Sequence, residues 1–224
     1  MNMIHGIIFD LDGVLVSTDE LHYRAWKRLA DREGILFDRS INDRLRGVSR
    51  MASLKIILER AARSYSAEEK EAMAAYKNDL YRASLDTLTE NDVLPGVLPT
   101  LAELWSRGFK LAVGSSSKNA KKILDKTGLL DRFDAIADGT DITRSKPDPE
   151  VFLCAAEKLG LPPGSCAVVE DAEAGIAAAT AGGMTAFAVG DARKSPLADG
   201  RLDDIRELLT LWNSRFAQKK YRPV

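Results

Sequence analysis

Short apolar runs rich in β-forming residues alternate with helical patterns along most of this sequence, and the alternation limits the folds open to it. Five runs lead from apolar into polar residues: GIIFD, KLAVGSSS, DAIAD, CAVVED and MTAFAVG. Helical segments separate most of them, and strands that alternate with helices form a parallel sheet with helices on both faces. The sequence therefore predicts an α/β fold with a Rossmann-like parallel sheet.

A long interval after the first run contains helix signals and no convincing strand. Its three patterns are ELHYRAWKRLADREG, SRMASLKIILERAARS and SAEEKEAMAAYKNDLYRASL. We therefore expect a helical cap domain inserted after strand one. The predicted boundaries are residues 18–91 for the cap, and residues 1–17 with 92–224 for the α/β core.

Two further patterns concern the ends of elements. Ser66 and Glu69 stand at capping-box spacing, which predicts a helix start near Ala67. The segment AVGDARKSPLADGRLDDI, after the last apolar run, has no clear strand pattern, and RLDDIRELLTLWNSRFAQKK predicts a final amphipathic helix. The sequence thus leaves residues 190–203 without a predicted structure.

Charge and cysteine content narrow the class of partner. A net charge of -1 gives no broad attraction to nucleic acid or anionic lipid, so anion recognition must come from a local cluster. Cys154 and Cys166 are too few for a disulfide framework and lack the close neighbours of a zinc site. Without a secretory signal pattern or a membrane-spanning run, we expect a cytoplasmic location. We also expect a monomer that acts on a small molecule, with no nucleic-acid or membrane partner.

Acidic residues crowd the end of the first strand, in FDLDGVLVSTDELH. On a strand that continued regularly, Asp10 and Asp12 would share one face and repel each other, so we expect a sharp turn at Asp12 and Gly13. A metal cation would relieve the repulsion. Taken alone, the spacing is as typical of an acid-rich surface turn.

Polar residues follow other strands of the predicted sheet, where ligands of such sheets bind. Glu170 and Asp171 end the run VVED, and oxygen ligands from separate strand ends suit Mg²⁺ better than zinc, although such a pair is more often a solvated helix start. The run GSSSKN offers hydroxyls and amides before a helix, as phosphate sites do, although isolated serine runs more often form ordinary caps. Lys146 precedes a proline, which predicts a loop, where a lone lysine usually faces solvent.

In this order, the DxD, Ser, Lys and Glu-Asp motifs resemble those of the haloacid dehalogenase-like phosphotransferases. The matching segments are FDLDGVL, VGSSS, SKPDPEVF and VEDAEAG, and the resemblance covers nearly the whole chain. It implies that Asp10 is a nucleophile forming an aspartyl-phosphate and that Asp12 is the general acid/base. It also implies Mg²⁺ held by Asp10, the Asp12 main-chain carbonyl and Asp171, with Glu170 close to the metal.

The resemblance also assigns the groups that would receive a phosphate. Lys146 would offset the repulsion between the attacking carboxylate and the phosphate dianion, while Ser115 and the Ser116 amide would bind equatorial oxygens. Phosphonate-cleaving relatives generally lack an acid at the position of Asp12, and dehalogenases lack the magnesium-site pattern. The leaving oxygen of a sugar phosphate must be protonated, which needs an acid such as Asp12. We therefore expect a phosphatase or a mutase that acts on a sugar phosphate.

Within the helical insert, TDELHYRAW, LRGVSRMASL and YKNDLY resemble the cap of the β-phosphoglucomutase branch of this family. The resemblance implies that Arg50 grips the phosphate that is not transferred, that His22 and Lys77 face the sugar or the acid/base, and that Thr18 lies at the hinge. The remaining residues implied for substrate or phosphate binding are Gly47, Ser117, Lys118 and Asn119. Without the resemblance, His22 would be interpreted as a packing or surface residue and Arg50 as a solvated arginine.

The predicted function is a Mg²⁺-dependent phosphomutase, an isomerase that interconverts β-glucose 1-phosphate and glucose 6-phosphate with β-glucose 1,6-bisphosphate as activator and intermediate. A second phosphate grip such as Arg50 has a physical reason, because the bisphosphate must present either phosphate to the same nucleophile. The first alternative is a sugar-phosphate phosphatase of the same superfamily. The second is a catalytically silent phosphate-binding or regulatory module.

Overall fold

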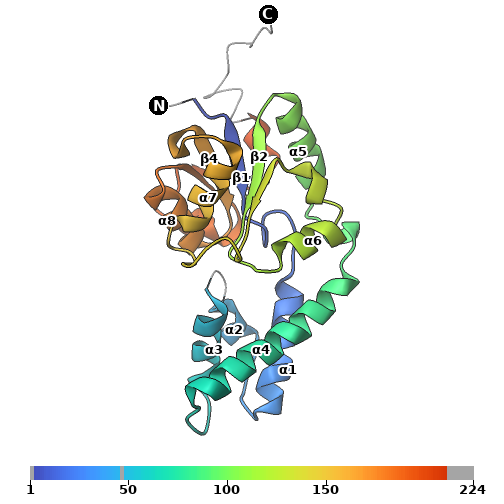
Figure 1. The fold of residues 1–224 in the computed structure, drawn as a ribbon, viewed down its shortest axis with the longest axis vertical. Helices are drawn as coiled ribbons and strands as arrows, with labels where there is room; N and C mark the ends of the chain where they lie inside the picture. Colours follow the sequence, from blue (N-terminus) through green and yellow to red (C-terminus); the bar gives the residue numbers. More distant parts are fainter. Residues whose placement is uncertain (1–2, 46–47, 211–224) are drawn as a thin grey trace, which may run out of the picture.

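Six parallel strands form the centre of the protein, which is described here from a computed structural model covering residues 3–45 and 48–210 (Figure 1). The strand order is β3-β2-β1-β4-β5-β6. The bounds are β1 Gly6–Phe9, β2 Lys110–Gly114, β3 Ala135–Ala137, β4 Cys166–Glu170, β5 Thr185–Ala188 and β6 Gly200–Arg201. Each of the five apolar runs of the sequence supplies one strand, and the predicted Rossmann-like α/β fold is confirmed.

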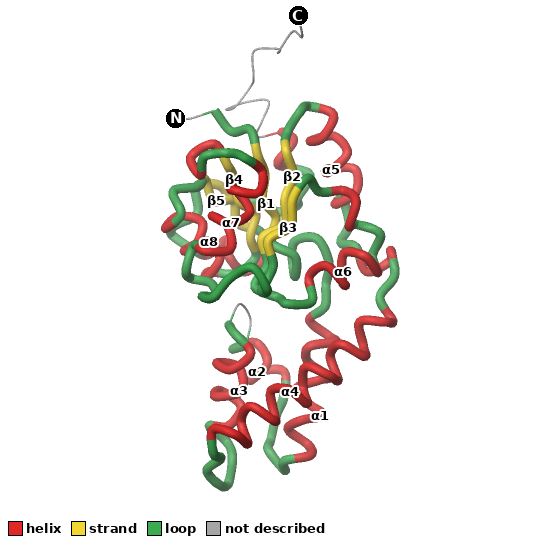
Figure 2. The backbone as a smooth tube through the Cα atoms, viewed as in Figure 1, coloured by secondary structure: helices red, strands yellow, loops and turns green. Residues whose placement is uncertain are grey.

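Helices cover both faces of the sheet (Figure 2). Side chains alternate between faces along a strand, so Ile7 and Phe9 pack with α5 (Val97–Ser106) and α6 (Ala120–Lys126) in one apolar cluster. Ile8 packs in the other cluster with α7 (Glu150–Leu159) and α8 (Glu173–Ala181). All three side chains are fully buried, and burial of the strands on both sides fixes the register in which their polar ends meet.

Strand β6 corrects the sequence analysis, which found no strand in residues 190–203. Gly200 and Arg201 pair with Phe187 and Ala188 of β5. Two residues are too few to show any periodicity, so the pairing depends on tertiary contacts. The predicted final helix lies largely outside the described residues. The described residues also contain five short 3-10 helices: Leu85–Thr87, Glu90–Asp92, Leu130–Arg132, Pro163–Ser165 and Gly190–Lys194.

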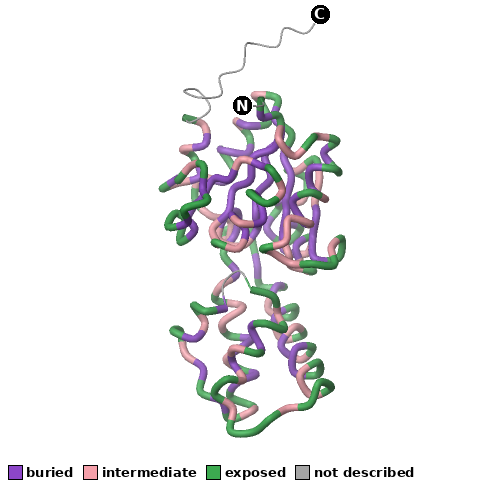
Figure 3. The backbone as a smooth tube through the Cα atoms, turned by 90° about the vertical axis from the view of Figure 1, so that its left-hand side faces the viewer, coloured by how far each residue is buried: buried purple, intermediate pink, exposed green. Residues whose placement is uncertain are grey.

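Four helices follow β1 and form a separate body beyond the carboxyl ends of the strands (Figures 1 and 3). They are α1 Asp19–Arg32, α2 Arg39–Asp43, α3 Arg50–Leu58 and α4 Ala67–Ser84, and we call them the cap helices. Their own apolar cluster contains Trp26, Leu29, Ile57 and Met73. No strand lies in the described part of residues 18–91, as expected. The short α2 was not predicted, and the cap boundaries themselves stay a prediction.

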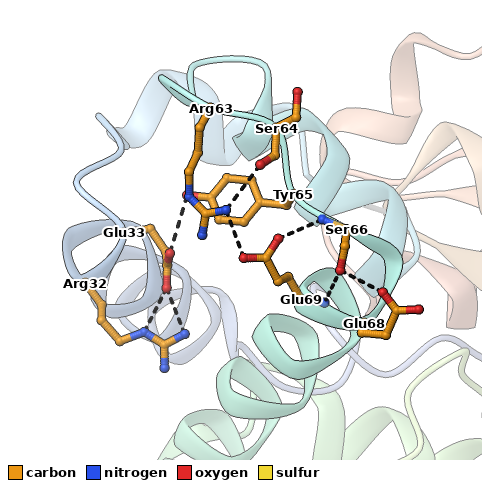
Figure 4. Close-up of polar contacts among 8 residues, drawn as sticks. All are labelled: Arg32, Glu33, Arg63, Ser64, Tyr65, Ser66, Glu68 and Glu69. Atoms are coloured by element: carbon orange, nitrogen blue, oxygen red, sulfur yellow. Dashed lines mark hydrogen bonds and ion pairs between the residues drawn. The ribbon is translucent and has the colours of Figure 1, made fainter.

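The start of α4 is held by the capping box that the sequence predicted (Figure 4). Glu69 N donates to Ser66 Oγ at 3.2 Å, and Ser66 N donates to Glu69 Oε2 at 2.7 Å. Arg63 holds the same carboxylate at 2.8 Å. The helix therefore begins at Ala67, as the sequence predicted. No helix among the described residues is long and apolar enough to cross a membrane.

Two adjacent linkers join the cap helices to the sheet. Val16 and Val93 form an antiparallel bridge, and Leu94 N donates to Leu15 O at 2.9 Å. The chain thus leaves the core and returns to it at one place. Hinge motions of inserted units occur at such short connections.

Candidate active site

A cavity of about 560 Å³ separates the strand ends from the cap helices, and both sides line it. The predicted residues found on its walls are Asp10, Asp12, His22, Arg50, Lys77, Ser115, Ser116, Ser117, Lys118, Asn119, Lys146, Glu170 and Asp171. Thr18 lies behind Asp12, to which its hydroxyl donates. Gly47, predicted to bind substrate or phosphate, lies outside the described residues. The structure brings the predicted groups together, while their individual roles stay predictions.

The chain turns sharply after β1, as the crowded acids of the sequence predicted. Gly13 has a φ of 78°, in the left-handed region that favours glycine, and its N–H donates to Val16 O at 2.8 Å. A Cβ at this position would lie 2.1 Å from Asp171 Oδ2. Glycine therefore allows both the turn and the close approach of Asp171 to the loop that carries Asp10 and Asp12.

Three carboxylates meet at the strand ends and could hold a metal ion. One oxygen from each of Asp10, Glu170 and Asp171 lies within 4.8 Å of the others. Burial, followed by the charges of Glu170 and Asp10, raises the pKa of Asp171 to about 8, and burial also raises the pKa of Glu170. A cation would remove this penalty, and three hard oxygen donors suit Mg²⁺. The Asp12 main-chain carbonyl stays a predicted fourth ligand.

Lys146 neutralises part of the same cluster. Its Nζ lies 2.5 Å from Asp10 Oδ1 and 2.7 Å from Glu170 Oε1. Burial alone would disfavour the ammonium, but these two carboxylates hold the pKa of Lys146 above its ordinary value. The lysine is therefore a permanent cation beside the predicted nucleophile, and the solvent-facing alternative is wrong.

The serine run after β2 forms a compact loop. Ser117 N donates to Ser115 Oγ and Asn119 N donates to Ser117 Oγ, each at 3.2 Å. A Cβ on Gly139 would lie 2.4 Å from Ser116 O, so a neighbouring loop backbone packs directly against the run. Ser116 Oγ is buried and has no hydrogen-bond partner among the described residues. Such a hydroxyl could pair with an oxygen of a bound anion.

The surroundings of Asp12, the predicted general acid/base, raise the pKa of its carboxyl group. Its side chain accepts from Thr18, and burial together with the charge of Asp10 raises its pKa to about 7, against the effect of the Thr18 hydrogen bond. A general acid/base works best when its pKa lies near the operating pH. The carboxyl group can therefore both give and accept a proton near neutrality.

His22 and Lys77 form a buried pair on the cap side of the cavity. Lys77 Nζ lies 2.8 Å from His22 Nδ1. Burial and the charge of Arg50 lower the pKa of Lys77 to about 7, and burial lowers the pKa of His22 well below its ordinary value. When Lys77 is protonated its ammonium only donates, so Nδ1 then accepts and the ring proton of the neutral imidazole lies on Nε2.

Tyr81 is a residue that the sequence analysis missed. It lines the cavity, stacks on His22 with ring centroids 4.0 Å apart, and its hydroxyl lies 3.1 Å from Thr18 Oγ1. Tyr81 follows Lys77 by four positions on α4, so the two share a helix face. That spacing was a signal available in the sequence. Asn78 was also missed, and its Oδ1 accepts from Asn119 Nδ2 at 3.4 Å.

Comparison with known proteins decides the family. A model of haloacid dehalogenase-like hydrolases matches residues 4–183, most of the chain. The chain belongs to this family. It is 44% identical over 194 residues to β-phosphoglucomutase from Bacillus subtilis, covering 86% of this chain and 85% of the relative. The crystal structure of β-phosphoglucomutase from Clostridium difficile has a TM-score of 0.84 and 41% identity, with 92% of this chain and 93% of that chain covered.

Phosphatases are also among the relatives of this family member. Fructose-1-phosphate phosphatase YqaB from Escherichia coli is 32% identical over 186 residues, which cover 82% of this chain and 95% of the relative. The predicted resemblance to haloacid dehalogenase-like enzymes, with β-phosphoglucomutase as a similar member, is confirmed. Membership of the family does not decide between a mutase and a phosphatase, because both activities occur among its members with this fold.

Proposed function

We propose that this protein is a Mg²⁺-dependent phosphomutase that interconverts β-glucose 1-phosphate and glucose 6-phosphate through phospho-Asp10. The intermediate and activator in this proposal is β-glucose 1,6-bisphosphate. The observation that carries it is one cavity lined by the transfer groups Asp10 and Asp12 and also by Arg50 of the cap. The identity of 44% to the Bacillus subtilis enzyme supports the same assignment.

In the transfer step, an oxygen of Asp10 forms a bond to phosphorus while the bond from phosphorus to the sugar oxygen breaks. Asp12 gives its proton to that leaving oxygen and thereby becomes a carboxylate. In the reverse direction Asp12 takes the proton from the sugar hydroxyl that attacks phospho-Asp10. Mg²⁺, held by the Asp10, Glu170 and Asp171 carboxylates, would supply charge stabilisation. Lys146 keeps the nucleophile oriented and lowers repulsion.

A mutase must hold the bisphosphate in two orientations. One phosphate lies against Asp10, while the other needs only a site that binds an anion. In this proposal that site is formed by residues that line the same cavity, namely Arg50, Lys118, Ser117 and Asn119. Exclusion of water would then protect phospho-Asp10 from hydrolysis. The proposal assigns that closure to a cap made of residues 18–91, in a monomeric, cytoplasmic enzyme.

The test supplies purified protein with β-glucose 1-phosphate, Mg²⁺ and a trace of β-glucose 1,6-bisphosphate, and measures glucose 6-phosphate and free phosphate together. We expect mostly glucose 6-phosphate and an initial lag that shortens as bisphosphate is added. Stoichiometric release of phosphate, indifference to bisphosphate and no glucose 6-phosphate would establish the phosphatase instead. This second candidate function, a sugar-phosphate phosphatase, is supported by the 32% identity to the Escherichia coli phosphatase.

A further inference from the structure

Tyr81 lies where the predicted proton-transfer and substrate-side groups meet. The side chain is 1% exposed, and its ring stacks on His22 at 4.0 Å between centroids. Lys77 Nζ lies 4.7 Å from the centre of the same ring. The hydroxyl reaches in the other direction, to Thr18 Oγ1 at 3.1 Å. Tyr81 thus links the polar groups of α4 and α1 to the loop that carries Asp12.

The direction of these hydrogen bonds follows from counting protons. A threonine hydroxyl has one proton, and Thr18 donates it to Asp12 Oδ1. The proton between the two hydroxyls must therefore come from Tyr81, whose pKa is raised by burial and by the charge of Asp12. A chain of donors runs from Tyr81 through Thr18 to one oxygen of Asp12. The other oxygen, Oδ2, is then the one that can carry the transferable proton.

We propose that Tyr81 is a positioning residue for the acid/base Asp12, acting through Thr18, an inference that rests on the proposed function. By donating to Thr18, Tyr81 fixes the rotation of that hydroxyl. The hydroxyl in turn fixes the carboxyl group so that Oδ2 faces the proton transfer.

The proposal separates reactions by their leaving group. A sugar oxygen must be protonated as its bond to phosphorus breaks, whereas acetate leaves acetyl phosphate as a stable carboxylate and needs no acid. Loss of the Tyr81 hydroxyl should therefore slow transfer from or to a sugar and spare the phosphorylation of Asp10 by acetyl phosphate. A role in packing alone would affect both reactions alike.

The experiment uses Tyr81→Phe, with Tyr76→Phe on the same helix as control because Tyr76 contacts Arg32 instead. Mutase turnover is measured alongside single-turnover phosphorylation by acetyl phosphate, followed by quenched intact-mass analysis. We expect kcat to fall about three- to tenfold in Tyr81→Phe with KM for the sugar unchanged, the effect of one neutral hydrogen bond. Acetyl phosphate phosphorylation should change less than about twofold, and Tyr76→Phe should match the wild type in both assays.

A second variant protects the test against an effect on folding. Thr18→Val should show the same separation between donors, and Tyr81→Phe added to it should cause no further loss, because both act along one chain. The proposal is overturned if Tyr81→Phe slows both reactions equally, if it slows neither, or if the two substitutions act additively. If the wild type proves to be a phosphatase, the same comparison uses kcat/KM for an alkyl phosphate against a nitrophenyl phosphate. The products formed by the wild type therefore test the proposed function, and the ratio of the two rates in each variant tests the role of Tyr81.

Discussion

Gly175, in the first turns of α8, allows the Glu170 side chain to fold back beneath the helix. A Cβ built on Gly175 would lie 1.9 Å from Glu170 Oε1 and 2.0 Å from its Cδ. In Gly175→Ala the carboxylate would have to move by about 1 Å or more to restore van der Waals separation. The movement would disturb its contacts with Lys146 Nζ at 2.7 Å and Ala172 N at 2.6 Å.

The magnitude follows from those two contacts. Weakening two hydrogen bonds to a charged group costs about 3 kcal/mol, since each contributes about 1.5–3 kcal/mol when intact. Replacing glycine by alanine within a helix returns up to about 1 kcal/mol. We therefore expect Gly175→Ala to lower the free energy of unfolding by about 2 kcal/mol, with the opposite sign from an ordinary helical substitution.

Urea unfolding without metal measures this effect, and the same helix supplies a control. Gly182 is the residue directly after α8, where a Cβ would meet no atom closer than 3.4 Å, so Gly182→Ala should change stability by less than about 0.5 kcal/mol. Glu170→Asp shortens the displaced side chain, so the double variant Glu170→Asp with Gly175→Ala should be more stable than the sum of the single effects predicts. A stabilised Gly175→Ala, or strict additivity in the double variant, would refute the reasoning.

Four further predictions concern the charged groups of the cavity. Asp10→Asn should fold and take up no phosphate from acetyl phosphate, and a full adduct by intact mass would rule out Asp10 as nucleophile. Asp12→Asn should slow transfer by roughly 10²–10⁴ at an unchanged Mg²⁺ requirement, whereas Asp171→Asn should raise that requirement, as Mg²⁺ titrations of the two variants would show. Arg50→Ala should lower mutase turnover roughly ten- to a hundredfold and raise the ratio of free phosphate to glucose 6-phosphate; an unchanged ratio contradicts the second phosphate site. The pKa of Lys77 is lowered from 10.5 to about 7 in the folded protein, so between these pH values the unfolded chain binds more protons than the folded one. Burial of the charged ammonium lowers the free energy of unfolding below pH 7, and this loss of stability disappears as the pH rises towards 10.5. The urea midpoint of unfolding, measured between pH 7 and 10.5, should therefore rise less with pH in Lys77→Met than in the wild type.

Much of the sheet and the core-side acids of the site could be predicted because their signals are local. Asp10 and Glu170 stand at the ends of apolar runs, and parallel topology places such ends at one edge. Strand β6 and helix α2 were missed because two and five residues show no measurable periodicity. Their formation depends on partners distant in sequence.

The cap side of the site needed more than local patterns. Arg50, His22 and Lys77 were assigned from the resemblance, since a helix histidine or a lone arginine has no distinguishing spacing. Tyr81 escaped because a tyrosine on an amphipathic helix predicts core packing, and only the three-dimensional arrangement shows its hydroxyl against Thr18. The pairing of Lys77 with His22 likewise joins residues on two helices, α4 and α1, which contact each other.

The paired linkers have a consequence for how this architecture can diversify. Val16 and Val93 are direct bridge partners, so the two ends of the segment between them are already neighbours in space. The entropy of closing a loop grows only slowly with its length, so the core tolerates a long or a short segment between these anchor points at similar cost. Exchange of this one contiguous segment would replace the cap side of the cavity, while the predicted nucleophile Asp10, the serine run and the three candidate metal-binding carboxylates would keep their places at the strand ends.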